Sequence, residues 1–340
     1  MNETKAVWIS ALVAMALYLS GFLTILTPLP LMYAAAVRGR RSGIAASVIS
    51  MCAVSLFYIM LLPAKGPAAG WLAYVPAPGM GLLGSMPEGF LPVFGIGYFA
   101  FFAAIAMTLA WGATKRLSLT AWGGYALAAG AGVIVTTLVV AGIVSNGSLI
   151  EGANSYILTI LREVVGAKDA TGFQSAQLVF VADNPERVAR SIIEVLPSLV
   201  FVYAVVAVSI NLVLGRKFMG ASNALARVPS AVKFRLPDWI IWAVIASGGL
   251  FFANSYFADY PPVRTMALNG LIAAGVLYFL QGAAVSIYFM QRIKFSLIRT
   301  IAYVAMIIFL QTVSIAFIVL GIADVWADFR LRHLKMQHQQ

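Results

Sequence analysis

The sequence is poor in the residues that carry most enzyme and metal chemistry. Of its 340 residues only 10% are charged, Cys52 is its one cysteine, and its two histidines, His333 and His338, lie near the carboxyl end. One cysteine excludes a disulfide within the chain and a cysteine-rich metal site, and the two histidines do not form an H-E-x-x-H zinc motif. We therefore expect no metal and no cofactor. Because the apolar segments also offer no base for a catalytic triad, we do not expect an enzyme.

Apolar residues dominate the chain instead. Hydrophobic residues make up 61% of it and the mean hydropathy is +0.92, whereas about a quarter of the residues in soluble domains are charged. This composition predicts an all-α integral membrane protein whose fold is a polytopic helix bundle. The first apolar stretch continues to Leu26 without a small-residue cleavage site, so we interpret it as a retained helix rather than a signal peptide.

Eight apolar segments are long enough to cross a hydrocarbon core, which takes about 20 helical residues. A shorter apolar stretch, residues 28–37, follows two prolines after the first segment, and we expect it to form a short, broken or re-entrant helix packed inside protein. The eight predicted spans are residues 7–26, 43–62, 90–113, 119–145, 191–214, 238–257, 266–291 and 299–322.

We predict a single integral membrane domain over residues 1–340. Its parts are an amino-terminal region at about 7–145, an outer loop at 146–190, carboxyl-terminal helices at 191–322 and a tail at 323–340. The outer loop contains the amphipathic run SYILTILREVV, which predicts a helix along the outer surface or a lid over a site. Asn184 and Pro185 then indicate the start of the next helix.

The loops alternate in charge, which predicts their sides of the membrane. The loops near residues 38–41, 115–116, 216–238 and 292–299 hold 13 Lys/Arg against one acid, whereas those at 63–89, 146–190 and 258–265 hold 6 basic and 7 acidic residues. The first set is therefore predicted to face inward, in a bacterial inner membrane. The net charge of +11 then reflects inner loops and not a nucleic-acid partner. Counting forward places the tail outside although it is basic, so its side and that of the amino terminus stay open.

The polar residues within the predicted spans are uncharged. On an ideal helix Tyr288 lies about 20° and Tyr278 about 60° from Gln281, while Asn269 lies about 120° round and about 18 Å nearer the outer surface. No acid is expected deep in any span, which argues against a proton-coupled or sodium-coupled carrier. The whole set comprises Asn211, Asn269, Gln281, Gln311, Tyr203, Tyr278, Tyr288 and Tyr303.

Two interpretations of Asn269 and Gln281 stay open. Buried amides hold membrane helices together at about 0.6–2 kcal/mol per hydrogen bond. They also serve as contacts for a neutral or aromatic small molecule, and Gly282 beside Gln281 would let a ligand or another backbone approach closely. Four residues spaced by four, Gly124, Ala128, Gly132 and Thr136, predict a further packing seam between helices.

Three separated stretches resemble the YybS-like family of bacterial integral membrane proteins, known as domain of unknown function 2232. They are ALNGLIAAGVLYFLQGAAVSIYFMQR at 267–292, LPDWIIW at 236–242 and LGIADVWADFR at 320–330. That family is in turn similar to the S-components of energy-coupling-factor vitamin transporters. Those proteins contain a short helix that begins with prolines, and residues 27–50 of this chain, TPLPLMYAAAVRGRRSGIAASVIS, resemble it. The resemblance implies that Thr27 to Tyr33 lie near a substrate site and that an energy-coupling ATPase module docks to the chain.

These observations lead to three functional hypotheses. The first is binding and transport of a small, largely uncharged molecule, with energy supplied by an ATPase module or another membrane protein. The alternatives are a non-catalytic membrane scaffold or assembly factor, and a lipid flippase. For the first hypothesis the candidate substrate-binding residues are Gln281, Tyr278, Tyr288, Gly282, Asn269, Thr27 and Tyr33.

Overall fold

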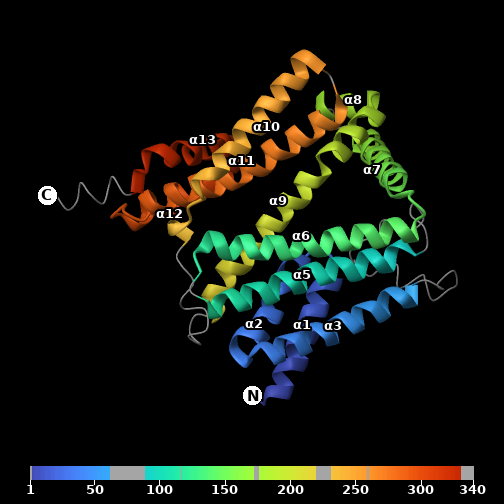
Figure 1. Ribbon diagram of the computed structural model, residues 1–340, viewed down its shortest axis with the longest axis vertical. Coiled ribbons are helices and arrows are strands. Elements are labelled where there is room, and N and C mark those ends of the chain that lie inside the picture. Colours follow the sequence, from blue (N-terminus) through green and yellow to red (C-terminus); the bar gives the residue numbers. More distant parts are fainter. Residues whose placement is uncertain are drawn as a thin grey trace. The chain divides into compact units, whose positions relative to one another are not determined.

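The computed structural model describes residues 2–61, 89–115, 117–171, 176–219, 231–258 and 260–330, and these contain helices and turns but no β-strand (Figure 1). Six of the helices are long and apolar enough to cross a membrane. The chain divides into two compact units, each described by itself below. Unit 1 comprises Met1–Leu117, Ala121–Leu196 and Tyr203–Val228, and unit 2 comprises Ser118–Thr120, Pro197–Val202 and Pro229–Gln340.

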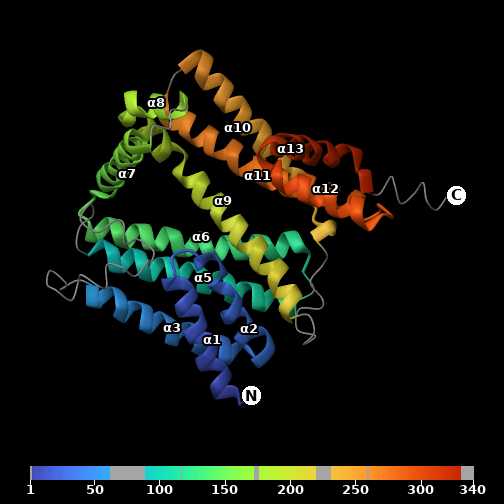
Figure 2. The same cartoon turned by 180° about the vertical axis from the view of Figure 1, so that it is seen from behind.

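Unit 1 contains the amino-terminal helices and most of the three that follow them. In both views α5 and α6 lie side by side (Figure 1, Figure 2), and Gly130 of α6 packs against the ring of Phe101 on α5. The elements are α1 (Glu3–Leu19), η1 (Thr24–Leu26), α2 (Pro28–Arg38), α3 (Arg40–Leu61), α5 (Phe90–Thr114), α6 (Leu119–Val144), α7 (Leu149–Thr171), α8 (Ala176–Asp183) and both ends of α9 (Pro185–Met219).

Unit 2 is built on a hairpin of two long helices, α10 and α11, which lie side by side in both views (Figure 1, Figure 2). A Cβ atom added to Gly270 of α11 would overlap the side chain of Ser247 on α10, so the glycine permits this close approach. The elements are η4 (Ala231–Lys233), η5 (Asp238–Ile240), α10 (Ile241–Ala253), η6 (Asn254–Ala258), α11 (Pro261–Met290), α12 (Ser296–Ile308) and α13 (Leu310–Ala327).

Six of the eight predicted spans coincide with helices that meet the length and hydropathy needed to cross a membrane. The other two differ, so the count of eight long helices is not confirmed. The first, α1, has 17 residues and ends at Leu19, because the Ser20 hydroxyl donates to the Leu17 carbonyl and accepts from the amide of Leu23. The last predicted span, 299–322, is wrong as one helix, because the chain breaks at Phe309 into α12 and α13.

The short helix predicted after the first span is α2, which has 11 residues and begins at Pro28. Leu31, Met32 and Ala34 are fully buried on it, so the helix is packed inside protein as its length requires. In the outer loop, α7 covers the amphipathic run and α9 begins at Pro185 as predicted.

The packing seam predicted on α6 is wrong. Gly124, Ala128, Gly132 and Thr136 are all exposed, and a Cβ atom added to Gly124 or Gly132 would meet nothing within 4 Å. The packed face is two residues out of step with the prediction and contains Trp122, Ala126 and Gly130. Trp122 of α6 packs against Gly112 of α5 and Phe101 of α5 packs against Gly130, so these two large side chains determine which face packs.

Candidate functional site

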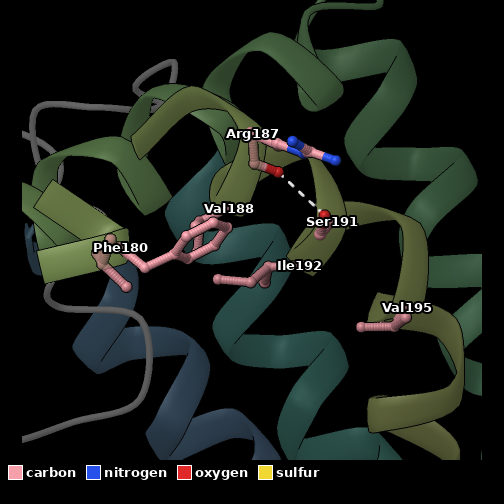
Figure 3. A pocket seen from close by; sticks show the side chains of 7 residues that line it. Phe180, Arg187, Val188, Ser191, Ile192 and Val195 are labelled. Carbon is pink, nitrogen blue, oxygen red and sulfur yellow. Dashed lines mark hydrogen bonds between the residues drawn. The ribbon is translucent and has the colours of Figure 1, made fainter. Parts of the chain in front are cut away.

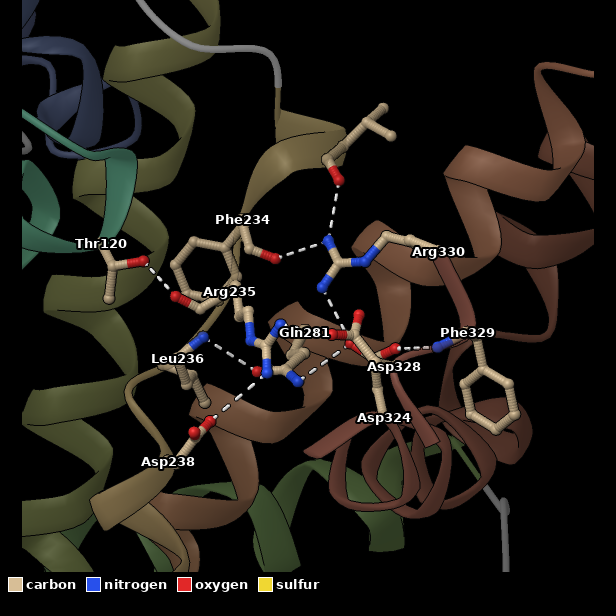
Figure 4. A network of polar contacts seen from close by, with 11 residues as sticks. Thr120, Phe234, Arg235, Leu236, Asp238, Gln281, Asp324, Asp328, Phe329 and Arg330 are labelled. Carbon is tan, nitrogen blue, oxygen red and sulfur yellow. Dashed lines mark hydrogen bonds and ion pairs between the residues drawn. The ribbon is translucent and has the colours of Figure 1, made fainter. Parts of the chain in front are cut away.

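Gln281 lies on α11 and is 1% exposed, in a cluster of polar side chains of unit 2 (Figure 4). Its Oε1 atom accepts a hydrogen bond of 2.9 Å from the backbone amide of Leu236, and its Nε2 atom donates to Asp324 Oδ2 at 3.1 Å. One amide thus connects α11 to α13 and to the segment that precedes α10. Both ends of the Gln281 side chain therefore have protein partners.

Asp324 is the centre of this cluster and is also 1% exposed. Its carboxylate accepts from Gln281, from the amide of Phe329 at 3.1 Å and from Arg330 Nη2 at 2.8 Å. Asp328 adopts a left-handed conformation with φ 45°, which ends α13 and turns the chain so that Arg330 faces Asp324. We refer to Gln281, Asp324 and Arg330 as the Asp324 cluster. Three donors on one carboxylate are what a buried charge needs in order to be stable.

Arg330 reaches beyond the carboxylate to the segment before α10. Its Nη1 atom donates to the carbonyl oxygens of Val232 and Phe234, each at 2.8 Å, and its side chain is 11% exposed. The guanidinium thus donates to two backbone carbonyls and to a carboxylate at the same time, which its planar arrangement of donors permits. The cluster therefore fastens the carboxyl end of α13 to residues 232–236.

A second ion pair lies at the rim of the cluster. Arg235 Nη1 donates to Asp328 Oδ2 at 2.7 Å, and Arg235 Nη2 lies 3.6 Å from Asp238 Oδ1. The hydrogen bond that Arg235 donates to Asp328 raises the pKa of the Arg235 guanidinium further above its ordinary value, so Arg235 stays cationic. The Arg235 carbonyl accepts from the Thr120 hydroxyl. With its side chain 39% exposed, Arg235 contributes less than a buried pair would.

The other candidates on α11 do not gather round Gln281. Tyr278 is fully buried and its hydroxyl has no hydrogen-bond partner among the described residues. Tyr288 lies about 10 Å further along the helix, where Arg292 stacks 4.3 Å over its ring and donates to its hydroxyl at 2.6 Å. Gly282 touches the backbone of Phe317 on α13, so its missing side chain serves the approach of two helices.

Asn269 has a separate set of partners in unit 2. Its Oδ1 atom accepts from the backbone amide of Ser198 at 2.7 Å, and its Nδ2 atom donates to the Thr265 carbonyl at 2.8 Å. Ser198 directly follows Pro197, which lies inside α9 and prevents a regular helical hydrogen-bond pattern there. The Asn269 amide therefore stabilises a proline-distorted turn. Ligand binding by Asn269, Gln281, Tyr278, Tyr288 or Gly282 stays a prediction.

In unit 1 three buried polar atoms have no partner among the described residues, namely Arg38 Nε and one atom each of Thr27 and Asn211. Thr27 and Asn211 are both fully buried, and Thr27 Oγ1 and Asn211 Oδ1 make no hydrogen bond. Asn211 Nδ2 donates to the Ile25 carbonyl at 2.7 Å and to the Ala207 carbonyl at 2.8 Å. The bond to Ile25 places Asn211 two residues from Thr27, and we call these two residues the Thr27–Asn211 pair.

Tyrosines supply further hydroxyl groups inside unit 1. Tyr98 on α5 donates to the hydroxyl of Tyr203 on α9 at 2.6 Å, and Tyr203 lies two helical turns before Asn211 on the same face. Tyr18 donates to the Gly95 carbonyl, and its ring contacts the ring of Tyr98 at a centroid distance of 5.9 Å. Tyr33, the remaining sequence candidate, is only half-buried on α2.

Sequence reasoning missed Asp324, Arg330 and the role of Asn211. The hydropathy falls after residue 322 and so places Asp324 in the tail, whereas α13 continues to Ala327. The available signal for this ion pair in the sequence is Asp324 followed six residues later by Arg330. Asn211 stood out only as one of several uncharged polar residues, because its partner Ile25 is 186 positions away in the sequence.

An apolar groove of about 660 Å³ is formed by α8 and α9 (Figure 3). Phe180, Val188 and Ile192 line it, with Arg187 as its one charged residue. Arg187 and Ser191 are connected along α9 by a hydrogen bond from the Ser191 hydroxyl to the Arg187 carbonyl at 3.0 Å. A groove of this kind is what the flippase hypothesis would use, and that hypothesis stays a prediction.

Comparison with known proteins places the chain in a family. The model of a family described as predicted membrane proteins, DUF2232, matches residues 67–325. Comparison with curated proteins and with solved structures gave no match. Residues 27–50 precede the matched region, so the similarity to S-components that rests on them stays a prediction. In the described part of the chain no group of three or more His, Cys, Asp or Glu residues is placed to hold a metal ion.

Proposed function

The chain belongs to the DUF2232 family of predicted membrane proteins, and we propose that it binds and transports a small, largely uncharged molecule. We further propose that another membrane protein, such as an energy-coupling ATPase module, supplies the energy. The observation that carries this proposal is the Thr27–Asn211 pair in unit 1. We place the ligand contact there rather than at Gln281, because Gln281 is engaged at both ends by protein groups.

The chemistry of the pair favours a neutral hydrogen-bonding ligand. A buried polar group left without a partner costs about 1–3 kcal/mol, so a molecule that satisfies both atoms would recover this loss on binding. Asn211 Oδ1 is an acceptor and the Thr27 hydroxyl is both donor and acceptor. The Tyr98 and Tyr203 hydroxyls, which also lie inside unit 1, are uncharged. A hydroxyl or amide group on a small aromatic or apolar body fits these partners.

The partners of the buried acid Asp324 indicate how transport would be driven. A coupled carrier keeps an intramembrane carboxylate for its ion. Asp324 is such a buried acid, but it already accepts from Gln281, Phe329 and Arg330. With its cation supplied by the protein itself, Asp324 is a poor site for a transported proton or sodium ion. Energy from a partner protein is therefore the proposal that agrees best with the chain.

A ligand screen on the purified full-length protein tests this function. A panel of neutral small molecules should contain one that raises the thermal unfolding temperature. Thr27→Val should abolish that ligand-induced rise without lowering the stability of the ligand-free protein, because it removes only an unpartnered hydroxyl. Thr136→Val, at an exposed site of α6, is the matched control and should leave the rise unchanged.

A membrane scaffold is the second candidate, and the Asp324 cluster supports it. The cluster, Asn269 and the contact of Gly282 with Phe317 all use polar or small residues for helix packing. A scaffold would show no ligand-induced rise across the panel, for the unmodified protein as for Thr27→Val. Co-purification with an ATPase module would favour the transport proposal.

A further inference from the structure

The two helices after α11 replace what the sequence predicts as one crossing. With 13 residues α12 is about 20 Å long and with 18 residues α13 is about 27 Å long, against a hydrocarbon core of about 30 Å. Phe309 separates them with φ −94° and ψ 18°. The side on which α13 ends therefore depends on the direction in which it runs.

Contacts with α11 give the direction of α13. A Cβ atom on Gly275 would lie 3.7 Å from Ile318. Further along, Gly321 approaches the backbone carbonyl of Tyr278, and Gln281 bonds to Asp324. Because the residue numbers rise together on both helices, α13 runs in the same direction as α11. The two helices consequently end on the same side of unit 2, which agrees with both views (Figure 1, Figure 2).

The start of α10 marks that side independently. Asp238, where η5 begins, is 20 residues before Ala258, and Gln281 is 20 residues after Pro261, so each lies about 30 Å from the turn that joins α10 to α11. The bond from Leu236 to Gln281 confirms that the two levels coincide. At this level Arg330 of the chain's end bonds to the carbonyls of Val232 and Phe234.

We propose that α12 and α13 form a re-entrant hairpin, which enters and leaves the membrane on the side of the basic loops, with the Asp324 cluster closing its base. The residues after α13 then lie on the same side as the turn that contains Arg292 and Lys294. This places Arg330 on the same side of unit 2 as the basic turn at 292–299, as expected for the inward-facing side of a membrane protein. Counting the predicted spans from the first basic loop puts the tail outside, because it treats residues 299–322 as a crossing. With a hairpin there, the tail lies inside.

The backbone at the break is suited to a turn within the membrane. There, every backbone polar group must find a partner in the protein. The amide of Phe309 donates to the Ala305 carbonyl at 2.9 Å, and its carbonyl accepts from Thr312 and Val313, each at 2.9 Å. The side of α12 with Ile301, Val304 and Ile308 is exposed and apolar, which suits contact with lipid.

Single-cysteine labelling tests the hairpin in the full-length chain. In a Cys52→Ser background, Ser296→Cys marks the start of α12, Gln340→Cys the carboxyl end and Tyr260→Cys the turn between α10 and α11. A membrane-impermeant maleimide is applied to right-side-out and inside-out vesicles. Gln340→Cys should react in the same preparation as Ser296→Cys and in the opposite one from Tyr260→Cys. Reaction of Gln340→Cys together with Tyr260→Cys would show a single crossing and overturn the proposal.

A fusion readout covers a cysteine that fails to react. The full chain is fused at its carboxyl end to a fluorescent protein that matures only inside the cell, or to alkaline phosphatase, which is active only outside. Fluorescence without phosphatase activity is expected, and the reverse result contradicts the hairpin. The outcome is independent of ligand binding, so it stands whether or not the proposed transport function holds.

Discussion

Gln281 on α11 and Asp324 on α13 share a hydrogen bond of 3.1 Å between two side chains that are each 1% exposed. The same glutamine holds the amide of Leu236, and the same aspartate holds Arg330. The sequence predicts the Gln281 amide to be a contact between helices or a ligand contact, and the structure places it in a buried network that includes charged groups. Loss of this network should therefore lower the stability of the protein.

Replacing Gln281 by leucine should destabilise the protein strongly. Gln281→Leu leaves the Leu236 amide without its acceptor and Asp324 without one donor, and each buried group left unsatisfied costs about 1–3 kcal/mol. We expect a loss of about 2–5 kcal/mol in the free energy of unfolding, measured in detergent micelles. Tyr288→Phe, which removes only the hydroxyl that accepts from Arg292 near the end of the same helix, is the control and should cost about 0.5 kcal/mol or less. Equal stability of the two variants would contradict the network.

The ion pair of Asp324 and Arg330 should show strong coupling. Arg330→Met alone leaves a buried carboxylate without its cation, and breaking such a pair costs about 3–5 kcal/mol. The double variant Asp324→Leu with Arg330→Met should recover a large part of that loss, because no unpaired charge is left inside. Arg235→Met removes the rim pair only and should cost about 1 kcal/mol or less. Additive effects of the two single substitutions in a double-mutant cycle would disprove the coupling.

The sequence predicts the long helices well because the physical requirement is local. About 20 apolar residues are needed to cross a bilayer, and α3, α5 and α11 show this directly in their composition. The break at Phe309 is not visible in the same way, since Gln311 and Thr312 are the only polar residues close to it and a membrane helix can contain such uncharged residues. The break depends on how α13 packs against α11, which hydropathy does not contain.

The candidate sites were predicted less well because their partners are distant in the sequence. Gln281 is recognisable as a buried amide, but Leu236 and Asp324 are 45 and 43 positions away. Thr27 was selected through a family resemblance, whereas Asn211 joins it only through folding. On α6 the regular stripe of small residues is exposed, and packing against Phe101 selects the face with Gly130 instead. The sequence therefore indicates which residues are buried amides or packing residues, but it does not indicate their partners.

Gly282 should be the least replaceable glycine of unit 2. A Cβ atom there would overlap the backbone carbonyl of Phe317, and one on Gly321 would overlap that of Tyr278. Because backbone cannot move aside as a side chain can, Gly282→Ala must separate α11 from α13, and we expect a loss of about 1–3 kcal/mol in unfolding free energy. Gly249→Ala on α10 meets nothing within 4 Å and should be neutral or slightly stabilising. Similar effects of both substitutions would show that the helices do not touch at Gly282.

Asn269 and Pro197 should be coupled, since the asparagine supports the turn that the proline distorts. Asn269→Leu removes the acceptor of the Ser198 amide, which should cost about 1–3 kcal/mol in unfolding free energy. In a Pro197→Ala background, α9 can restore its regular backbone bonds, so the same Asn269→Leu substitution should then cost about 1 kcal/mol or less. Thermal and chemical unfolding of the four proteins in this cycle measures the difference, which for contacting residues is about 0.5–3 kcal/mol. If Asn269→Leu costs the same with and without Pro197, the asparagine acts through a different contact and the proline is not the reason for its position.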